Sequence, residues 1–179
     1  SLTPAECIRI FVGKLFHLQA EWNPMDEKML LGVRLPRVIA AVFVGAGLAL
    51  SGAVYQGIFK NPLVSPEFLG VSSGACVGAA VGILLSFSAA AIQVSAFAGG
   101  IGAVALTVLI PRAMRSDSNI MLVLSGIIVS GAMSSVLGFI KYIADPATEL
   151  AAITYWQLGS FSYVDTDAVL SILPLSLLA

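Results

Sequence analysis

Charged side chains are scarce in this chain of 179 residues, where Asp, Glu, Lys and Arg together make up 11%. Soluble domains carry about 25% charged residues. With 58% hydrophobic residues and a mean hydropathy of +0.97, the chain has too few polar side chains to cover a water-exposed surface. The composition therefore excludes a soluble globular domain and predicts an integral membrane protein. The sequence also has no basic patch, so no nucleic acid partner is expected.

Residues that bind metals or form disulfides are also rare. The two cysteines, Cys7 and Cys76, are distant in sequence, and Cys76 lies within a hydrophobic run. This spacing favours free thiols over a disulfide or a metal site. The single histidine, His17, has no partner at a metal-ligand spacing and is expected at the surface. The sequence therefore predicts neither a metal nor a cofactor.

Long uncharged runs mark the predicted membrane helices. The run 38–59 is long enough to cross a hydrocarbon core of about 30 Å. The uncharged run 68–111 is about twice as long, and its most polar part, 86–93, marks the expected turn. Because backbone groups in lipid must be paired within their own segment, we expect an all-α, polytopic membrane helix bundle. The predicted membrane helices cover 36–59, 69–86, 93–111, 119–141 and 167–179.

The two ends of the chain carry further expectations. No secretory signal peptide is recognisable in the first residues. The last run is still apolar at Ala179, so we expect a fragment that stops within a membrane helix. Near the start, "TPAE" (3–6) has the pattern of a capping box, with Thr3 as N-cap, Pro4 at the first helical position and Glu6 as partner. An amphipathic helix on the membrane surface should follow, with an apolar stripe of Ile8, Phe11, Val12, Leu15 and Phe16.

Catalytic motifs are absent from the sequence. It contains no HExxH, no GxSxG and no P-loop, and no paired carboxylates lie within the predicted membrane helices. We therefore predict no catalytic residue and no enzyme activity. The four complete membrane helices also lack the intramembrane charge that an ion-coupled pump usually needs.

Small and polar residues within the membrane helices indicate how they pack. Gly74, Gly78 and Gly82 recur every four residues, so they share one helix face and predict close packing against a neighbouring helix. Gln56 has two interpretations, a hydrogen bond between helices or a place along a transport pathway.

Lys and Arg are distributed unequally between the two sides of the predicted bundle. The regions 1–37, 86–92 and 141–167 carry six of them, whereas the opposite side carries three. The positive-inside rule alone would place the N-terminal region in the cytoplasm.

A long ordered motif resembles a known family. "RLPRVIAAVFVGAGLALSGAVYQGIFKNPLVSPEFLGVSSGA" (34–75) resembles the permeases of ABC importers for iron–siderophore complexes, haem and vitamin B12. "YWQLGSFS" (155–162) is similar to a second family segment, and "LTPAE" to the segment that follows the first membrane helix. The chain departs from the commonest family pattern at Val64, usually alanine, and at Ser65, usually acidic.

The resemblance implies an architecture and partners. Such permeases have about ten helices and form homodimers in the bacterial cytoplasmic membrane, with two ATPase subunits inside and a substrate-binding protein outside. This chain would hold roughly five helices and lack the first helix and the second half. Residues 1–35 and the loop 142–166, with a short helix, would be extracytoplasmic, against the charge count.

The resemblance also assigns roles to single residues. Arg34 and Arg37 would dock the binding protein through its carboxylates, with interfacial anchoring as the alternative. Asn61 and Leu63 would narrow the cytoplasmic end of the pathway, although Pro62 also favours a purely structural helix–helix corner. The other gate position corresponds to Asn119 and Ile120.

The implied function is ATP-driven import of an iron–siderophore complex by alternating access. Haem or vitamin B12 is the alternative substrate. An ion-driven secondary carrier and a membrane scaffold without transport activity are the competing classes of function.

Overall fold

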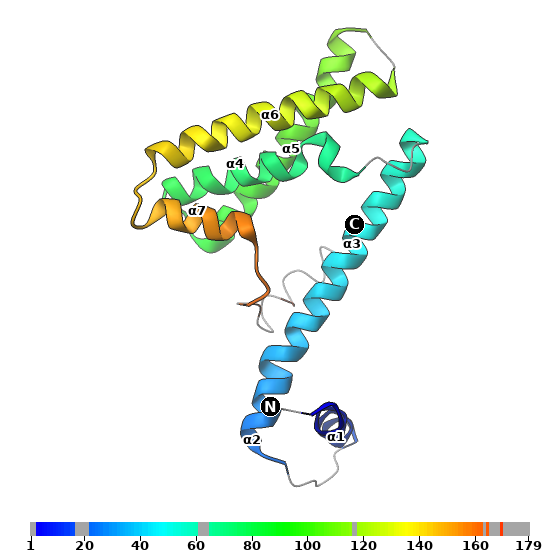
Figure 1. Ribbon diagram of the computed structural model, residues 1–179, viewed down its shortest axis with the longest axis vertical. Coiled ribbons are helices and arrows are strands. Elements are labelled where there is room, and N and C mark those ends of the chain that lie inside the picture. The colour runs from blue at the N-terminus through cyan, green and yellow to red at the C-terminus, as the bar shows by residue number, and fades with distance from the viewer. Residues whose placement is uncertain are drawn as a thin grey trace. The chain divides into compact units, whose positions relative to one another are not determined.

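The computed structural model describes residues 3–16, 22–60, 65–115, 118–162, 164 and 169, and its regular elements are all helical. This agrees with the predicted all-α fold (Figure 1). Contacts divide the chain into two compact units. One comprises Ser1–Leu50 with Ser160–Ala179, and the other comprises Ser51–Gly159.

The first unit begins with α1 (Pro4–Leu15) and continues through α2 (Pro24–Met29), the π-helical η1 (Leu30–Arg34) and the first part of α3 (Leu35–Phe59). The predicted capping box of α1 is confirmed. Glu6 Oε2 accepts hydrogen bonds from the Thr3 backbone N–H at 2.7 Å and from the Thr3 hydroxyl at 2.8 Å. These bonds hold the pKa of Glu6 below its usual range, because they stabilise the ionised carboxylate.

The second unit contains the end of α3, the 3₁₀ turn η2 (Pro66–Leu69), α4 (Val71–Leu84), α5 (Ala89–Ala113), α6 (Asn119–Ile143) and α7 (Glu149–Leu158). The helix α5 begins at Ala89 rather than at the predicted 93, because Ser88 caps it by accepting the Ala91 N–H. The helix α7 lies within the predicted loop 142–166. The predicted membrane helix 167–179 lies outside the described residues except for Val169.

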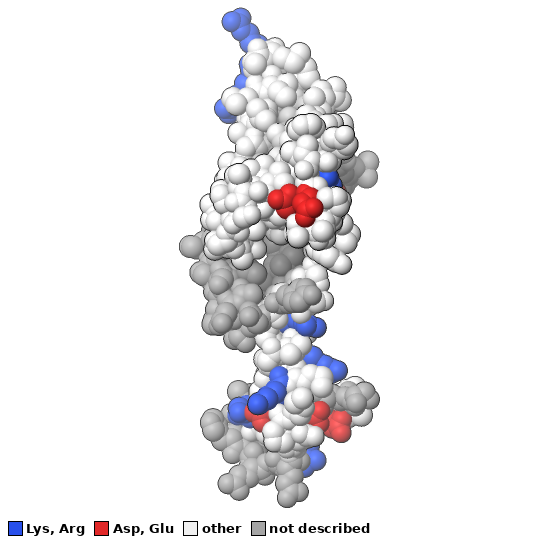
Figure 2. Space-filling view, turned by 90° about the vertical axis from the view of Figure 1, so that its left-hand side faces the viewer, with Lys and Arg blue, Asp and Glu red and all other residues white. Residues whose placement is uncertain are grey.

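Within the described residues, three helices are long and apolar enough to cross a membrane, namely Pro24–Phe59, Ala89–Ala113 and Asn119–Ile143. The helix α4 has 14 residues, fewer than the predicted range 69–86, because Gly70 separates it from η2. Uncharged surface covers most of the face that Figure 2 presents. A surface of this kind suits lipid or further apolar helices.

Small residues allow the helices of the second unit to pack closely. A Cβ atom on Gly74 would lie 2.5 Å from the Gly99 carbonyl oxygen, and one on Gly82 would lie 2.7 Å from Ser95 Oγ. At Gly78 the backbone carbonyl of Ser95 already occupies the place of a Cβ atom. All three glycines of α4 therefore face α5, and at Gly74 and Gly78 the two backbones are in contact.

Two apolar clusters form the core of the second unit. One joins α4, α6 and α7 through Ala80, Leu137, Ile140, Ala144 and Ile153. In the other, the end of α3 contacts η2, where Phe59 and Leu69 are buried among partly buried neighbours. Apolar contacts thus hold η2, which directly precedes α4, against the end of α3.

Candidate functional site

The arginines of the RLPR motif lie where η1 passes into α3, in the first unit. Arg34 is exposed and ends η1, whereas Arg37 is half-buried in the first turn of α3. Arg34 also borders an apolar groove of about 280 Å³. The groove is lined by Cys7, Ile8, Phe11, Leu30, Arg34, Leu35 and Val38. The two arginines thus have the same motif but different surroundings.

Arg37 makes a contact that the sequence did not indicate. Its Nη2 donates a hydrogen bond to the backbone carbonyl of Ser162, 125 positions away. Ser162 ends the second motif, 155–162, so the structure joins two motifs that are distant in sequence. A hydrogen bond to a backbone carbonyl requires no particular side chain, which is why no sequence pattern signals it.

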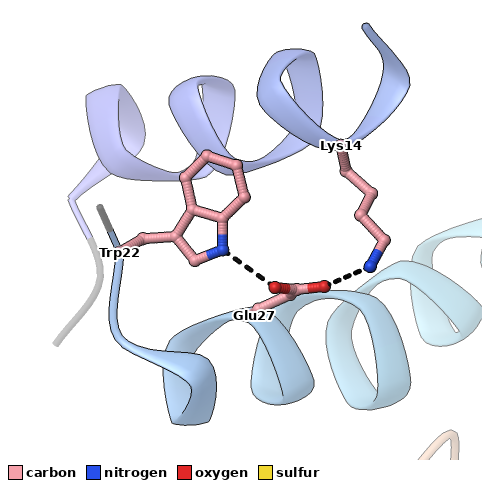
Figure 3. A network of polar contacts seen from close by, with 3 residues as sticks. All are labelled: Lys14, Trp22 and Glu27. Atoms are coloured by element: carbon pink, nitrogen blue, oxygen red, sulfur yellow. Dashed lines mark hydrogen bonds and ion pairs between the residues drawn. The ribbon is translucent and has the colours of Figure 1, made fainter. Parts of the chain in front are cut away.

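The N-terminal helix is attached to the segment that leads into α3. Glu27 accepts from Lys14 Nζ at 2.6 Å and from Trp22 Nε1 at 2.8 Å (Figure 3). The Trp22 ring also lies against Gly13 so closely that a Cβ atom there has no room. The Glu27 carboxylate and the Trp22 ring therefore connect α1 to α2. The helix α2 is followed in the sequence by η1, which ends at Arg34.

The second candidate region is the corner at residues 65–70, which we call the 65–70 corner. Its backbone turns through η2 and ends at Gly70, whose φ of +74° is in the left-handed region that glycine adopts without strain. The buried Thr107 hydroxyl of α5 donates to the Leu69 carbonyl at 3.1 Å. The Phe68 carbonyl lies directly against Gly126 of α6, where a side chain would not fit.

The 65–70 corner is thus held by backbone contacts to two helices, and a small groove of about 230 Å³ remains beside it. The groove is lined by Ser65, Glu67, Phe68, Ile127 and Ser130. Among these described lining residues, Glu67 is the one acidic residue, and it is exposed. Sequence reasoning missed Thr107 and Gly126, because a single threonine or glycine in an apolar helix carries no distinctive pattern.

The remaining predicted pathway residues are located as follows. Asn61 and Leu63 lie outside the described residues. Asn119 and Ile120 begin α6 and are exposed, with 75% of the Ile120 surface accessible. Gln56 is exposed on α3. The structure therefore gives positions for three of the five predicted pathway residues.

A larger apolar cavity of about 630 Å³ lies in the second unit, along α5. Its residues come from α4, α5 and α7, with Gln93 and Trp156 as the polar-tipped members. Among the residues that the structure describes, no group of three or more His, Cys, Asp or Glu side chains is placed to hold a metal ion.

Comparison with known proteins finds a matching family model and similar permease proteins of import systems. The model described as the FecCD transport family matches residues 2–179. The molybdate import system permease protein MolB of Haemophilus influenzae is 40% identical over 162 residues, which cover 89% of this chain and 48% of MolB. A probable iron chelatin transport system permease protein of Helicobacter pylori is 44% identical over 150 residues, which cover 83% of this chain and 45% of that protein. The chain thus spans about half the length of these curated relatives.

A solved structure is similar as well. It is described as an inward-facing conformation of a metal-chelate type ABC transporter, and it matches with a TM-score of 0.80 at 33% sequence identity. The match covers 98% of this chain and 60% of that chain. The helical arrangement found here is therefore also that of a membrane transporter.

Proposed function

This chain belongs to the FecCD transport family, and we propose that it forms part of the membrane-spanning permease of an ATP-driven bacterial importer. The observation that carries the proposal is the match over 2–179 together with three membrane-length helices that have an uncharged centre. Such a permease is not itself an enzyme, since ATP is hydrolysed by a separate ATPase subunit.

The proposed mechanism is alternating access. Two permease subunits form a pathway in the cytoplasmic membrane, a binding protein delivers the substrate from outside, and two ATPase subunits drive opening to either side. The exposed Arg34 supports docking of an acidic surface, because a guanidinium binds carboxylates through paired hydrogen bonds. Arg37 belongs to the same proposed docking end, although its Nη2 is bonded to Ser162 in this structure.

The cytoplasmic end of the proposed pathway is the 65–70 corner and its surroundings. Asn61 and Leu63 directly precede this corner in the sequence, and Asn119 and Ile120 begin α6. We propose these four residues as the gate, with Gln56 on α3 as a lining residue. The exposure of Ile120 supports its place in the gate, because an apolar gate residue must be free to contact the gate residues of the second permease subunit.

An iron–siderophore complex is the proposed substrate. The described residues that line the 630 Å³ cavity carry no charge, which favours a large chelate over a small bare ion. Support also comes from the iron chelatin permease of H. pylori and the metal-chelate type of the solved structure. Haem and vitamin B12 remain alternatives, and the name of MolB adds molybdate.

The test is uptake by the full-length protein in proteoliposomes with its ATPase and binding protein. We expect ATP-dependent accumulation of one ferric siderophore, with haem, vitamin B12 and molybdate as parallel substrates. An ATPase variant that cannot hydrolyse ATP serves as the control and should abolish uptake. Uptake that follows a proton or sodium gradient and persists in this control would refute the proposal in favour of a secondary carrier.

A further inference from the structure

The groove of about 230 Å³ beside the 65–70 corner borders the middle of a membrane-length helix. Ser130, one of its lining residues, is near the centre of the 25 residues of α6, about 17 Å from the first of them at 1.5 Å per residue. The contact between the Phe68 carbonyl and Gly126 holds the corner against the same helix. We therefore expect the exposed Glu67 at membrane depth, although the predicted membrane helices contain no carboxylate.

The polar side chains of this groove have no partner within the part of the chain that the structure describes. The Glu67 carboxylate makes no ion pair or hydrogen bond there, and neither do the hydroxyls of Ser65 and Ser130. By contrast, Ser125 and Ser135 of α6 donate to carbonyls one turn earlier in their own helix, at 2.7 and 3.0 Å. A carboxylate at membrane depth needs a cationic partner, because little water is available there to solvate its charge.

The cations of this chain do not supply that partner. The second unit contains four of them, namely Lys60, Arg112, Arg115 and Lys141. Within the described residues none of these four pairs with Glu67, and Lys141 instead donates to Gln157. The other five of the nine Lys and Arg precede the run 38–59, which is long enough to cross the membrane before the corner begins.

We propose that this groove binds one basic side chain, and that this Lys or Arg comes from the half of the full-length permease that the chain does not span. The Glu67 carboxylate neutralises the incoming charge, and the hydroxyls of Ser65 and Ser130 accept the remaining N–H groups. Phe68 and Ile127 line the groove for the methylene stem. A groove of about 230 Å³ is smaller than a usual ligand pocket, so it suits one side chain rather than a chelate.

The source of the basic side chain follows from depth and length. The chain covers 48% of MolB and 45% of the iron chelatin permease of H. pylori, so a full-length protein of that size has further helices to place beside α6. Such helices reach membrane depth, whereas the ATPase subunits stay outside the hydrocarbon region. The ion pair then fastens the 65–70 corner to the second half of the permease. This inference rests on the proposed function, because it assumes a full-length membrane permease.

Thermal unfolding of the full-length protein in detergent tests the site. Glu67→Gln leaves the basic side chain without its counter-ion, so we expect the melting temperature to fall by about 5 °C. Ser130→Ala removes one acceptor and should lower the melting temperature by less. Ser135→Ala is the matched control and should leave it unchanged, because the Ser135 hydroxyl is exposed and bonds within its own helix.

A set of double variants identifies the partner. Each Lys and Arg of the second half is replaced by Gln in turn, alone and together with Glu67→Gln. We expect one of these replacements to lower the melting temperature alone but to restore most of it in the double variant, because losing both charges of a pair costs less than losing one. Lys60→Gln, Arg112→Gln and Arg115→Gln should restore nothing when combined with Glu67→Gln.

Three results would overturn the inference. The first is a Glu67→Gln protein as stable as Ser135→Ala, which would show that no cation depends on the carboxylate. The second is rescue by Lys60→Gln, Arg112→Gln or Arg115→Gln, and the third is the absence of rescue by any replacement in the second half. Failure of the proposed function looks different, since the expected melting temperatures would then be found in a protein without ATP-dependent uptake.

Discussion

Thr107 is a fully buried hydroxyl within an otherwise apolar stretch of α5, and its bond to the Leu69 carbonyl is what ties that helix to the end of η2. The Leu69 carbonyl does not take part in the hydrogen-bond pattern within α4, which begins at Val71. Buried carbonyl groups of this kind need a partner, and here a side chain supplies it. The Thr107 side chain thus supplies one of the two helix contacts that hold the 65–70 corner, beside the contact of the Phe68 carbonyl with Gly126.

Thr107→Val keeps the shape of the side chain and removes the donor. We expect it to destabilise the full-length protein by about 1–3 kcal/mol, because the Leu69 carbonyl stays buried without its partner. The measurement is thermal unfolding in detergent, in which the fraction of protein that remains monodisperse is monitored as the temperature rises.

Thr154→Val is the matched control for this variant. The Thr154 hydroxyl is exposed and donates to the Leu150 carbonyl of its own helix at 2.7 Å, so its loss should change little. Equal losses of stability in the two variants would show that the Thr107 bond has no special role.

At the scale of elements, the contact between α4 and α5 depends on the absence of side chains. Gly78 is the most demanding position, since the Ser95 carbonyl lies where its Cβ atom would be. Gly78→Ala should therefore force the two helices apart, although alanine favours helix more than glycine does. We expect a loss of about 1–3 kcal/mol, typical of overpacking, and a correspondingly lower melting temperature in detergent.

Gly102→Ala provides the control within the same pair of helices. No atom lies within 4 Å of a Cβ atom placed at Gly102, so alanine should be neutral or slightly stabilising there. If Gly78→Ala were as stable as Gly102→Ala, the backbone contact between α4 and α5 would not be the cause of their packing.

The elements also show which features can be predicted from sequence. The capping box of α1 followed from Thr3 and Glu6, because both partners lie within four residues and have recognised side chains. The spacing of the glycines in α4 likewise predicted a helix face for close packing. The structure was needed to identify α5 as the helix that packs against this face. The Arg37–Ser162 bond was unpredictable, since it joins one side chain to a backbone carbonyl 125 positions away.

At the scale of the whole molecule, the orientation in the membrane is the point on which two sequence arguments disagree. The count of Lys and Arg favours a cytoplasmic N-terminal region, with six against three on the opposite side. The family resemblance implies the reverse. The rule counts charges in all the loops of a protein, and this chain spans about half the length of its curated relatives. A partial count therefore carries less weight than the motif, and we expect the region before α3 to be extracytoplasmic.

Cysteine labelling can decide between the two orientations. In full-length protein with Cys7→Ser and Cys76→Ser, Met25→Cys and Met114→Cys each introduce one thiol at a position that is 68% and 60% exposed, respectively. The helices α3, α4 and α5 lie between these positions. We expect each of them to cross the membrane, as the uncharged runs of the sequence predict, and three crossings would put the two thiols on opposite sides. A membrane-impermeant maleimide added to intact spheroplasts should label Met25→Cys at once and Met114→Cys only after lysis. The opposite pattern would support the charge count, and it would also remove Arg34 from the side on which a binding protein docks.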